Sequence, residues 1–482
     1  MRRRGYHRRT ISTDGGGLDL RMYDIEEGLP DSLELCKLGP VAETRRGRKI
    51  VKRRIWWIRG TFLIVGAVLC AQIPSDPEPR WWRGNLHTHT LWSDGDGFPE
   101  MAIDWYRENG YQFLALSDHN LLSEGQKWMP VKEVAAKAKV DAFGRYLARF
   151  GPGWVETRGS EAKGTLEVRL KPFDEYRALM EERGRFLLVQ AEEITGSAAN
   201  GRALHMNALN LAEVVPSQAG ATIRDMIAQN LWAVQESARR TGREVMVHVN
   251  HPNYKWGVTA EDLAAIVDER FFEVWNGVEN DNDPGDERRP STDEIWDIAN
   301  TIRIAGMNAP PLYAVAVDDT HNYHGNNPRA MPGRGWVMVR ARRLTPESLI
   351  RAMRAGDFYA STGVTLDSVT FDKDTRKLSL EVHATAGETF VTRFVGTRRG
   401  ANLKGKPRLD AEGRAIATTL DYRSSEGPQI GEVLSEVKGA SPSYRLRGDE
   451  LYVRAIVTSS VAPVVPSAEF KYKRAWTQPV GW

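Results

Sequence analysis

The chain has 482 residues, of which 41% are hydrophobic and 27% are charged, which is the composition of an ordinary soluble protein. This balance excludes a collagen-like chain, a wholly disordered chain and a polytopic membrane protein. Residues 1–59 carry 15 Lys and Arg against 8 Asp and Glu, so the formal net charge of +3 hides a mildly acidic remainder. Because a mildly acidic protein lacks the basic surface that contacts the phosphate backbone of DNA or RNA, no nucleic-acid partner is expected.

The amino-terminal region has the pattern of an export signal. Residues 1–54 are predicted to be a disordered tail that ends in a basic n-region, and a start codon placed too early is the alternative explanation of the tail. Within residues 55–73 an apolar run is followed by prolines, as in a secretory signal peptide. The run is about half of the roughly 20 apolar residues that a membrane-spanning helix needs, so an uncleaved anchor is the alternative. We therefore expect a periplasmic or secreted protein, attached to the membrane only through this segment if at all.

Between residues 80 and 325, short apolar runs end in histidine or carboxylate. The first run ends in NLHTHT, and residues two apart on a strand share a face, so His87 and His89 can reach one ion. A helix is predicted over 99–110, since it begins with Pro and ends with Gly. Further along, the same pattern supplies these candidate residues: Asp94, His119, Glu192, Glu193, His205, His248, His251, Glu273, Asp318, Asp319 and His321.

Continuous apolar runs of this kind predict strands that are buried on both faces, as in parallel sheets covered by helices. Metal-ligand residue types at the carboxyl ends of such strands describe the mouth of an α/β barrel. Imidazoles and carboxylates without thiolates favour catalytic Zn, Mn or Fe over structural zinc. Four or more histidines and three carboxylates exceed the needs of one ion, so two or three divalent metal ions are expected. Such ions lower the pKa of a bound water to about 7, which predicts hydrolysis.

These motifs resemble the polymerase and histidinol phosphatase (PHP) domain, a metallohydrolase family. The matching segments between residues 84 and 325 are NLHTHT with SDG, LSDHN, AEEIT, HMNAL, VNHP and DDTH. The resemblance implies a distorted (β/α)7 TIM-like barrel, placed at residues 80–362. FFEVWNG, RAGDFYASTG and AWTQPV are similar to the carbaryl-hydrolase-like branch, whose members are often exported.

The resemblance also implies how the residues share the ions. One ion would be held by His87, His89, a bridging Glu193 and Asp319, and a second by the same Glu193 with His205 and His251. A third would be held by Asp94, His119 and His321, and it is the weakest site because some family members have His in place of this Asp.

At several positions two nearby residues could each be the metal ligand. Glu193 is preferred over Glu192 because it matches the family's glutamate, and Asp319 over Asp318 because only Asp319 lies two residues from His321. His251 ends its strand, whereas His248, inside the apolar run, is expected to be structural or to support a ligand. His324 is a candidate proton donor to the leaving group, and Glu273 is expected at the pocket rim, as a support for a ligand or as a substrate contact.

Two further regions complete the predicted organisation. An excursion at about 123–185, with helical periods at 130–149 and 171–185 and a hairpin at 151–170, is either a lid or pocket wall, or a solvated insertion. Residues 363–482 are predicted to form a small antiparallel β-sandwich-like domain whose expected role is stabilisation rather than substrate binding.

The sequence therefore predicts an exported metal-dependent hydrolase that acts on a small-molecule ester, with a phosphoester preferred. A carbamate, ester or amide hydrolase of the carbaryl-hydrolase type is the alternative, and a non-catalytic metal- or glycan-binding surface protein is the alternative of another class. No oligomeric state is predicted.

Overall fold

The structure is a computed structural model that describes residues 76–482. The predicted tail at 1–54 and the predicted signal or anchor segment at 55–73 lie outside the described residues. Among the helices of 76–482, none is long and apolar enough to cross a membrane.

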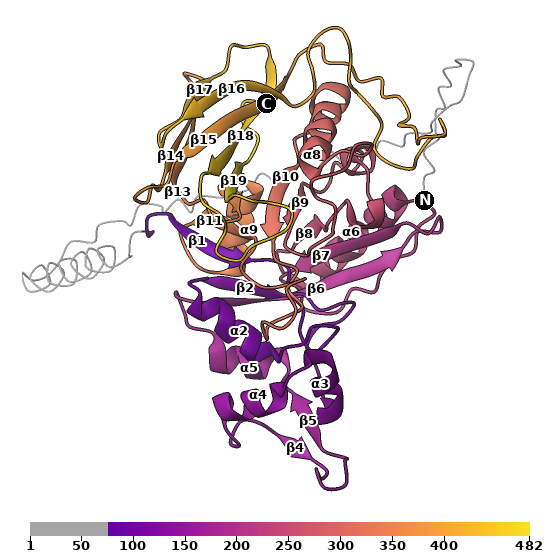
Figure 1. Cartoon of the computed structure of the whole chain (residues 1–482), viewed down its shortest axis with the longest axis vertical. Coiled ribbons are helices and arrows are strands. Elements are labelled where there is room, and N and C mark those ends of the chain that lie inside the picture. Colours follow the sequence, from indigo (N-terminus) through magenta and orange to yellow (C-terminus); the bar gives the residue numbers. More distant parts are fainter. Residues whose placement is uncertain (1–75) are drawn as a thin grey trace, which may run out of the picture. The chain divides into compact units, whose positions relative to one another are not determined.

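A thirteen-stranded sheet runs through the described residues and includes every predicted ligand-bearing run (Figure 1). Its first seven strands, in spatial order, are β10 (Tyr313–Val317), β9 (Phe271–Asn276), β8 (Met246–Val249), β7 (Ala203–Leu209), β6 (Leu187–Ser197), β2 (Phe113–Leu116) and β1 (Arg80–Asn85). The expected mixed α/β architecture is confirmed at this level.

Six of these seven strands run parallel, and β7 is antiparallel to both of its neighbours. The sequence pattern suggested only parallel strands. The difference arises because the turn at 198–202 between β6 and β7 is too short for a crossover, and a short connection joins only antiparallel strands.

The two ends of the seven-strand row meet beyond their carboxyl ends. Thr88, which follows β1, forms an isolated parallel bridge with Thr320, which follows β10. The backbone N–H of His89 donates to the Thr320 carbonyl at 2.9 Å. This bridge brings the first and last ligand-bearing segments together.

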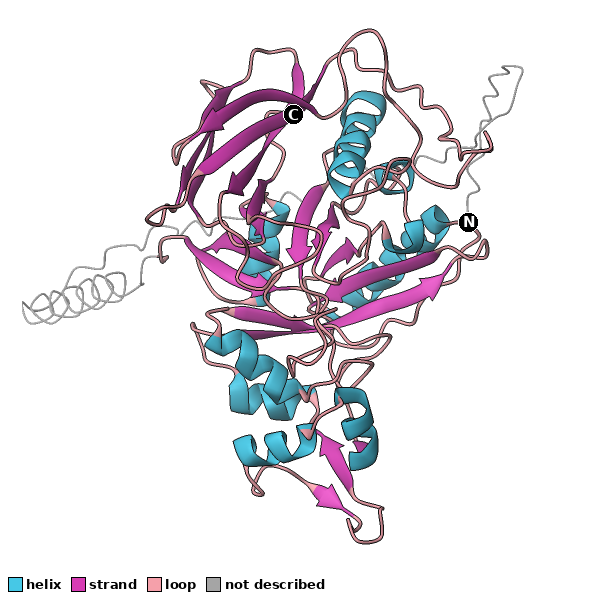
Figure 2. Cartoon of the chain, viewed as in Figure 1, coloured by secondary structure: helices cyan, strands magenta, loops and turns pink. Residues whose placement is uncertain are grey.

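Helices join these strands, as Figure 2 shows in cyan, and their ends follow the local sequence. They are α2 (Pro99–Glu108), α6 (Ile223–Thr241), α7 (Ala260–Ala264) and α8 (Thr292–Thr301), while α9 (Pro346–Arg354) comes after the last strand of the row. The predicted helix at 99–110 is confirmed as α2, and Gly110 follows it with a φ of 78°. Helix α6 begins with a capping box, in which Thr222 and Asp225 satisfy each other's backbone N–H groups.

The strands of the row are buried on both faces, as their continuous apolar runs predict. In β9, Phe272 and Val274 pack into one buried cluster while Phe271 packs into another. In β10, Ala314 and Val315 divide between the same two clusters. Side chains alternate along a strand, so a strand with apolar residues at every position needs a core on each side.

The excursion after β2 forms a layer of its own, at the lower end of Figure 1. It contains a small sheet of β3 (Lys127–Pro130), β5 (Glu167–Leu170) and β4 (Thr157–Arg158), with helices α3 (Val131–Ala138), α4 (Ala142–Phe150) and α5 (Phe173–Met180). The predicted hairpin is confirmed as β4 and β5. The predicted single helix at 130–149 is wrong, because Lys139 takes a left-handed φ of 54° and separates α3 from α4.

The carboxyl-terminal region consists of antiparallel strands, as expected. The large sheet continues from β1 through β11 (Trp336–Ala341), β12 (Phe358–Ser361), β19 (Arg474–Thr477), β18 (Glu450–Ser459), β15 (Phe390–Arg398) and β16 (Glu432–Lys438). A second sheet contains β13 (Leu366–Asp372), β14 (Lys377–Val382) and β17 (Ser443–Arg445). Because β12 pairs with β19, the sheet is continuous across the predicted boundary at 362/363. The separate domain and its role stay predictions.

Candidate metal centre

The predicted ligand residues converge at the carboxyl ends of the seven-strand row. His87 and His89 follow β1, His119 follows β2, and His251 follows β8, while Glu193 and His205 lie within β6 and β7. Asp319 and His321 follow β10, and Asp94 lies in the loop after His89. Residues up to 234 positions apart in the chain therefore lie within a few ångströms of one another.

His87, His89 and Asp319 form the most buried part of the cluster. The Nε2 atoms of the two imidazoles lie 3.1 Å apart. Both face Asp319 Oδ1, at 3.2 Å from His87 and 3.0 Å from His89. His87 and His89 are fully buried and Asp319 is 6% exposed.

Glu193 lies at the centre and reaches both sides of the cluster. Its Oε1 lies 3.4 Å from His87 Nε2, 3.0 Å from His205 Nδ1 and 3.6 Å from His251 Nε2. Its Oε2 lies 3.3 Å from His89 Nε2 and 2.7 Å from His119 Nδ1. A carboxylate so placed can bridge two ions.

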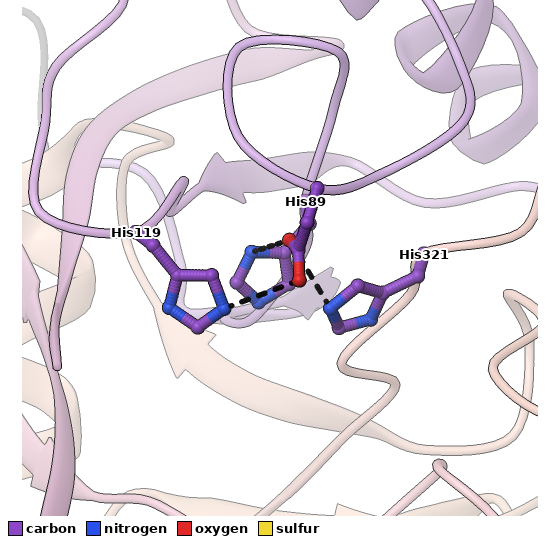
Figure 3. A group of neighbouring side chains, drawn as sticks. His89, His119 and His321 are labelled. Atoms are coloured by element: carbon purple, nitrogen blue, oxygen red, sulfur yellow. Dashed lines mark ion pairs between the residues drawn. The ribbon is translucent and has the colours of Figure 1, made fainter. Parts of the chain in front are cut away.

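The third group surrounds Asp94. Figure 3 shows His89, His119 and His321 pointing toward one another, and the dashed lines mark their ion pairs with the Asp94 carboxylate. These pairs measure 3.6 Å from His89, 3.6 Å from His119 and 3.4 Å from His321. The Asp94 side chain is 54% exposed, so this is the most open part of the centre.

The donor set fits divalent cations. Three groups of side chains each bring their ligand atoms within 4.8 Å of one another: His87, His89 and Asp319; His119, Glu193 and His205; and His89, Asp94, His119 and His321. Glu193 Oε2 and Asp319 Oδ1 are buried without a hydrogen-bond partner in the described part of the chain. A buried carboxylate oxygen without a donor is costly, and a bound cation would satisfy it.

The histidine tautomers also leave nitrogens free to bind cations. His87 Nδ1 donates to Glu273 at 2.8 Å, His119 Nδ1 to Thr195 at 2.6 Å, and His321 Nδ1 to the Asp319 carbonyl at 2.8 Å. Each bond fixes the ring and leaves the Nε2 lone pair directed into the cluster, as in metal sites where an outer partner orients a histidine ligand.

The charges of the cluster are strongly coupled. Burial would raise the pKa of Glu193, but the neighbouring rings, His87 first, hold that pKa well below its usual range. Burial would lower the pKa of His251, but Glu193 and nearby carboxylates raise it to about 9. Such shifts place positive charge among these carboxylates, and bound cations would supply the same charge.

Glu273 and His248 lie beneath the cluster. Glu273 is fully buried, so the structure does not place it at a pocket rim. Its Oε1 orients His87, and its Oε2 accepts from the backbone N–H of His251 and from Asn276 Nδ2, at 2.8 and 2.9 Å. Burial lowers the pKa of His248 to about 4, and this neutral ring lies 3.4 Å from Glu273. Glu273 supports the ligands from behind. In the described part of the chain neither ring nitrogen of His248 has a hydrogen-bond partner, so its supporting role stays a prediction.

Asp318 and Glu192, the alternatives to Asp319 and Glu193, bind other parts of the chain. Asp318 accepts the backbone N–H groups of Gly333, Arg334 and Gly335 and the Tyr106 hydroxyl, at 2.6–2.9 Å. Glu192 accepts the backbone N–H of Val215 at 2.9 Å. Neither carboxylate is part of the three ligand groups.

His324 does not lie where the sequence reasoning placed it. Its Nε2 donates to the Asp96 carbonyl at 3.0 Å, its side chain is 4% exposed, and it does not line the cavity over the cluster. The position of His324, three residues after His321, therefore did not predict where its side chain points.

The cluster opens into a cavity of about 300 Å³. Sequence reasoning missed several of its lining residues because they end no apolar run: Tyr254, Asp281, Asn322, Asn327 and Arg329. It also missed Asn250, whose Nδ2 donates to Glu193 Oε1 at 2.8 Å. A larger hollow of about 650 Å³, lined by residues such as Arg80 and Glu182, contains no residue of the cluster. The smaller cavity is therefore the candidate site.

The excursion braces the loop that carries Asp94. Lys137 of α3 donates to the Ser93 carbonyl at 2.6 Å, and Lys127 of β3 donates to the Trp92 carbonyl at 2.5 Å. Asn326, in the loop after His321, donates to the Ala138 carbonyl at 2.7 Å. The excursion therefore contacts the loops of the site but does not line the cavity itself, and its role as a lid or pocket wall stays a prediction.

Changing Glu273 to Gln should weaken cation binding without removing a ligand. An amide cannot hold the His87 N–H and the two other donors as the carboxylate does, and outer-partner changes typically lower metal affinity by about 10- to 100-fold. Metal titration followed by calorimetry would measure the loss. Glu269→Gln, which changes a carboxylate just before the other end of β9, is the matched control, and equal affinities in the two variants would contradict the supporting role.

Comparison with known proteins finds structural likeness only. No family model matches the sequence, and no curated protein matches it. A two-domain protein from Bacteroides vulgatus containing a predicted PHP-like metal-dependent phosphoesterase is 13% identical, with a TM-score of 0.35 over 85% of this chain and 98% of that one. A protein from Bifidobacterium adolescentis assigned as a metal-dependent phosphoesterase is 14% identical, with a TM-score of 0.25 over 52% of this chain and 93% of that one. At these TM-scores the likeness carries no argument about function.

Proposed function

We propose that this chain is a metal-dependent hydrolase of the PHP type and that its substrate is a small-molecule phosphoester. The observation that supports it is the convergence of eight histidine and carboxylate side chains, with orphaned buried oxygens, beneath one open cavity. His251 is in none of the three ligand groups, but it lines the same cavity, 3.6 Å from Glu193. Divalent cations held there would supply a hydroxide nucleophile and stabilise negative charge on the reacting group.

The protein's own residues would prepare the site. Glu273 and Thr195 fix the rings of His87 and His119, so that little reorganisation is needed when cations bind. Asp319 and His251 have left-handed φ angles of 50° and 24°, and such strained backbone is concentrated at functional sites. The seven-strand row, closed by the Thr88–Thr320 bridge, is the proposed distorted barrel that holds these segments in register.

Arg329 favours an anionic substrate over a neutral one. Its backbone carbonyl is held by Glu279 N–H at 2.9 Å and by Arg334 Nη1 at 3.0 Å, which places the residue at the cavity. Its side chain is exposed and lines the cavity. A cation over a metal centre attracts a phosphate group and gains little from a carbamate.

The test of the function is turnover by the purified chain with added Mn, Zn or Fe. We expect hydrolysis of nitrophenyl phosphate or its diester to exceed that of naphthyl carbamates and carboxylic esters. A preference for carbamates would instead support the carbaryl-hydrolase-like alternative. Full metal occupancy with no turnover of any ester would support a binding protein and contradict the proposal.

Changing Arg329 to Ala should raise KM for phosphoesters by about tenfold, about 1.4 kcal/mol, and leave KM for neutral esters unchanged. The effect should shrink at high salt because the residue is exposed. Arg399→Ala removes an exposed charge away from the cavity and serves as the control. An equal change of KM for charged and neutral substrates would show that Arg329 does not discriminate between anionic and neutral substrates.

Export of the chain is also a proposal, and it depends on the segment at 55–73. Fractionation of cells that produce the full chain, with sequencing of the mature amino terminus, would distinguish a cleaved signal from an anchor.

A further inference from the structure

One acidic side chain in the cavity has no role in the cluster. Asp281 is 2% exposed and lines the cavity together with Glu193, His251 and Asp319. Among the described residues, the ion pairs of His251 go to Glu193 and Asp319 and not to Asp281, whose carboxyl group is in none of the three ligand groups. Its oxygens are not among the fully buried atoms that lack a partner, because they reach the open space of the cavity, where a ligand can meet them.

The chain on both sides of Asp281 is held firmly. Asn280 and Asn282 take left-handed φ angles of 73° and 63°, which asparagine adopts more readily than most residues. The Asn280 N–H donates to Glu469 at 3.2 Å, and Asn282 exchanges hydrogen bonds with Asn253. Asp283 accepts the backbone N–H of Asn276 at 2.7 Å. The segment is therefore fixed by its neighbours, while the Asp281 carboxyl is left for the cavity.

We propose that Asp281 is the proton donor to the leaving group of a substrate bound in this cavity. This inference rests on the proposed function, and it assigns to Asp281 the task that sequence reasoning gave to His324. His324 is hydrogen-bonded to the Asp96 carbonyl and does not line the cavity, so it cannot reach a substrate there.

The local charges keep a proton available at this position. Burial raises the pKa of Asp281 to about 7; His251 opposes the rise, and Asp319, Glu273 and Glu469 add to it. Asp283, whose pKa is also raised well above its usual value by burial, lies two residues away. Tyr254 and Arg329 also line the cavity. A general acid works best when its pKa lies near the working pH.

The proposed step balances without a further reactant. Water gives up one proton to solvent, its oxygen forms the new bond to phosphorus, and the bond between phosphorus and the leaving oxygen breaks with its electron pair on that oxygen. The proton of the Asp281 carboxyl passes to the leaving oxygen, and the carboxylate regains a proton from solvent. Protonation matters most for an alkyl or phenyl leaving group, and little for nitrophenolate, which is stable as an anion.

The experiment compares wild type with Asp281→Asn on phosphoesters of graded leaving group, at saturating metal. The amide has the same size and cannot donate an acidic proton. We expect a loss of about 100- to 1000-fold on phenyl and alkyl esters and of less than about fivefold on nitrophenyl esters. On the poorer leaving groups, the fall of wild-type activity as pH rises should vanish in the variant.

Two further measurements keep the result decisive. Metal content and thermal midpoint should match wild type, and the infrared band of a protonated carboxyl group at about pH 6 should weaken in Asp281→Asn. Asp283→Asn, in the same segment but outside the cavity lining, should retain the wild-type dependence on leaving group. An equal loss on all leaving groups, or an unchanged infrared band, would overturn the role of Asp281 alone. Absence of turnover by wild type on every ester would instead overturn the proposed function, and this inference with it.

Discussion

Glu193→Gln should abolish turnover while Glu192→Gln leaves it nearly unchanged. Glu193 is 1% exposed, and its two oxygens lie within 3.6 Å of five histidines. If it bridges two ions, an amide removes a negative ligand from both at once. We expect turnover to fall by at least about a thousandfold, or about 4 kcal/mol, together with a loss of bound metal.

The adjacent residue makes an unusually close control. Glu192 is buried and lies on the other face of β6, where it accepts the Val215 N–H and has no contact with the cluster. Burial raises the pKa of Glu192 to about 7, so the neutral amide resembles its protonated form. Activity assays with metal analysis of both variants measure the difference. If Glu192→Gln lost metal and Glu193→Gln kept it, the assignment by strand face would be wrong.

The sequence was most informative where a ligand residue ends an apolar run. His87, His119 and Asp319 could all be found in this way, because a buried strand has to end at the sheet edge and its next residue lies at that edge. The two-residue spacing of His87 and His89 similarly predicted that the pair would converge. Eight of the nine predicted ligand residues fall into groups with metal-ligand spacing, and the ninth, His251, lies 3.6 Å from Glu193. The structure groups Glu193 and His205 with His119, and the sharing of ions that the resemblance implies stays a prediction.

The sequence was least informative where loops set the direction of a side chain. Asp281 and Arg329 end no strand. The residues beside Asp281 are held by Glu469 and Asn253, and Arg329 is held by Glu279, all far away in the chain. His324 and Glu273 were expected at the cavity and do not line it. A residue's place in the sequence, near a ligand or at the end of a strand, does not fix whether its side chain points into the cavity. The break between α3 and α4 arises from one left-handed residue, which an amphipathic period does not reveal.

Asp318 and Asp319 should separate stability from catalysis. Asp319→Asn should fold normally, because Asn adopts the left-handed φ of 50° at this position about as readily as Asp does. It removes the carboxylate that faces both His87 and His89, so we expect loss of bound metal and a fall in turnover of at least about a hundredfold, about 2.7 kcal/mol. Its thermal midpoint without metal should stay close to that of wild type.

Asp318→Asn should have the reverse effect. The Asp318 carboxylate accepts three backbone N–H groups from 333–335 and the Tyr106 hydroxyl, and an amide turns one acceptor into a donor that faces these donors. Leaving such buried groups unsatisfied should cost about 2–4 kcal/mol of unfolding free energy, while the folded fraction keeps its metal. Denaturant unfolding and metal analysis of both variants measure the two effects. A stable Asp318→Asn that cannot bind metal would show that the i, i+2 relation to His321 selected the wrong aspartate.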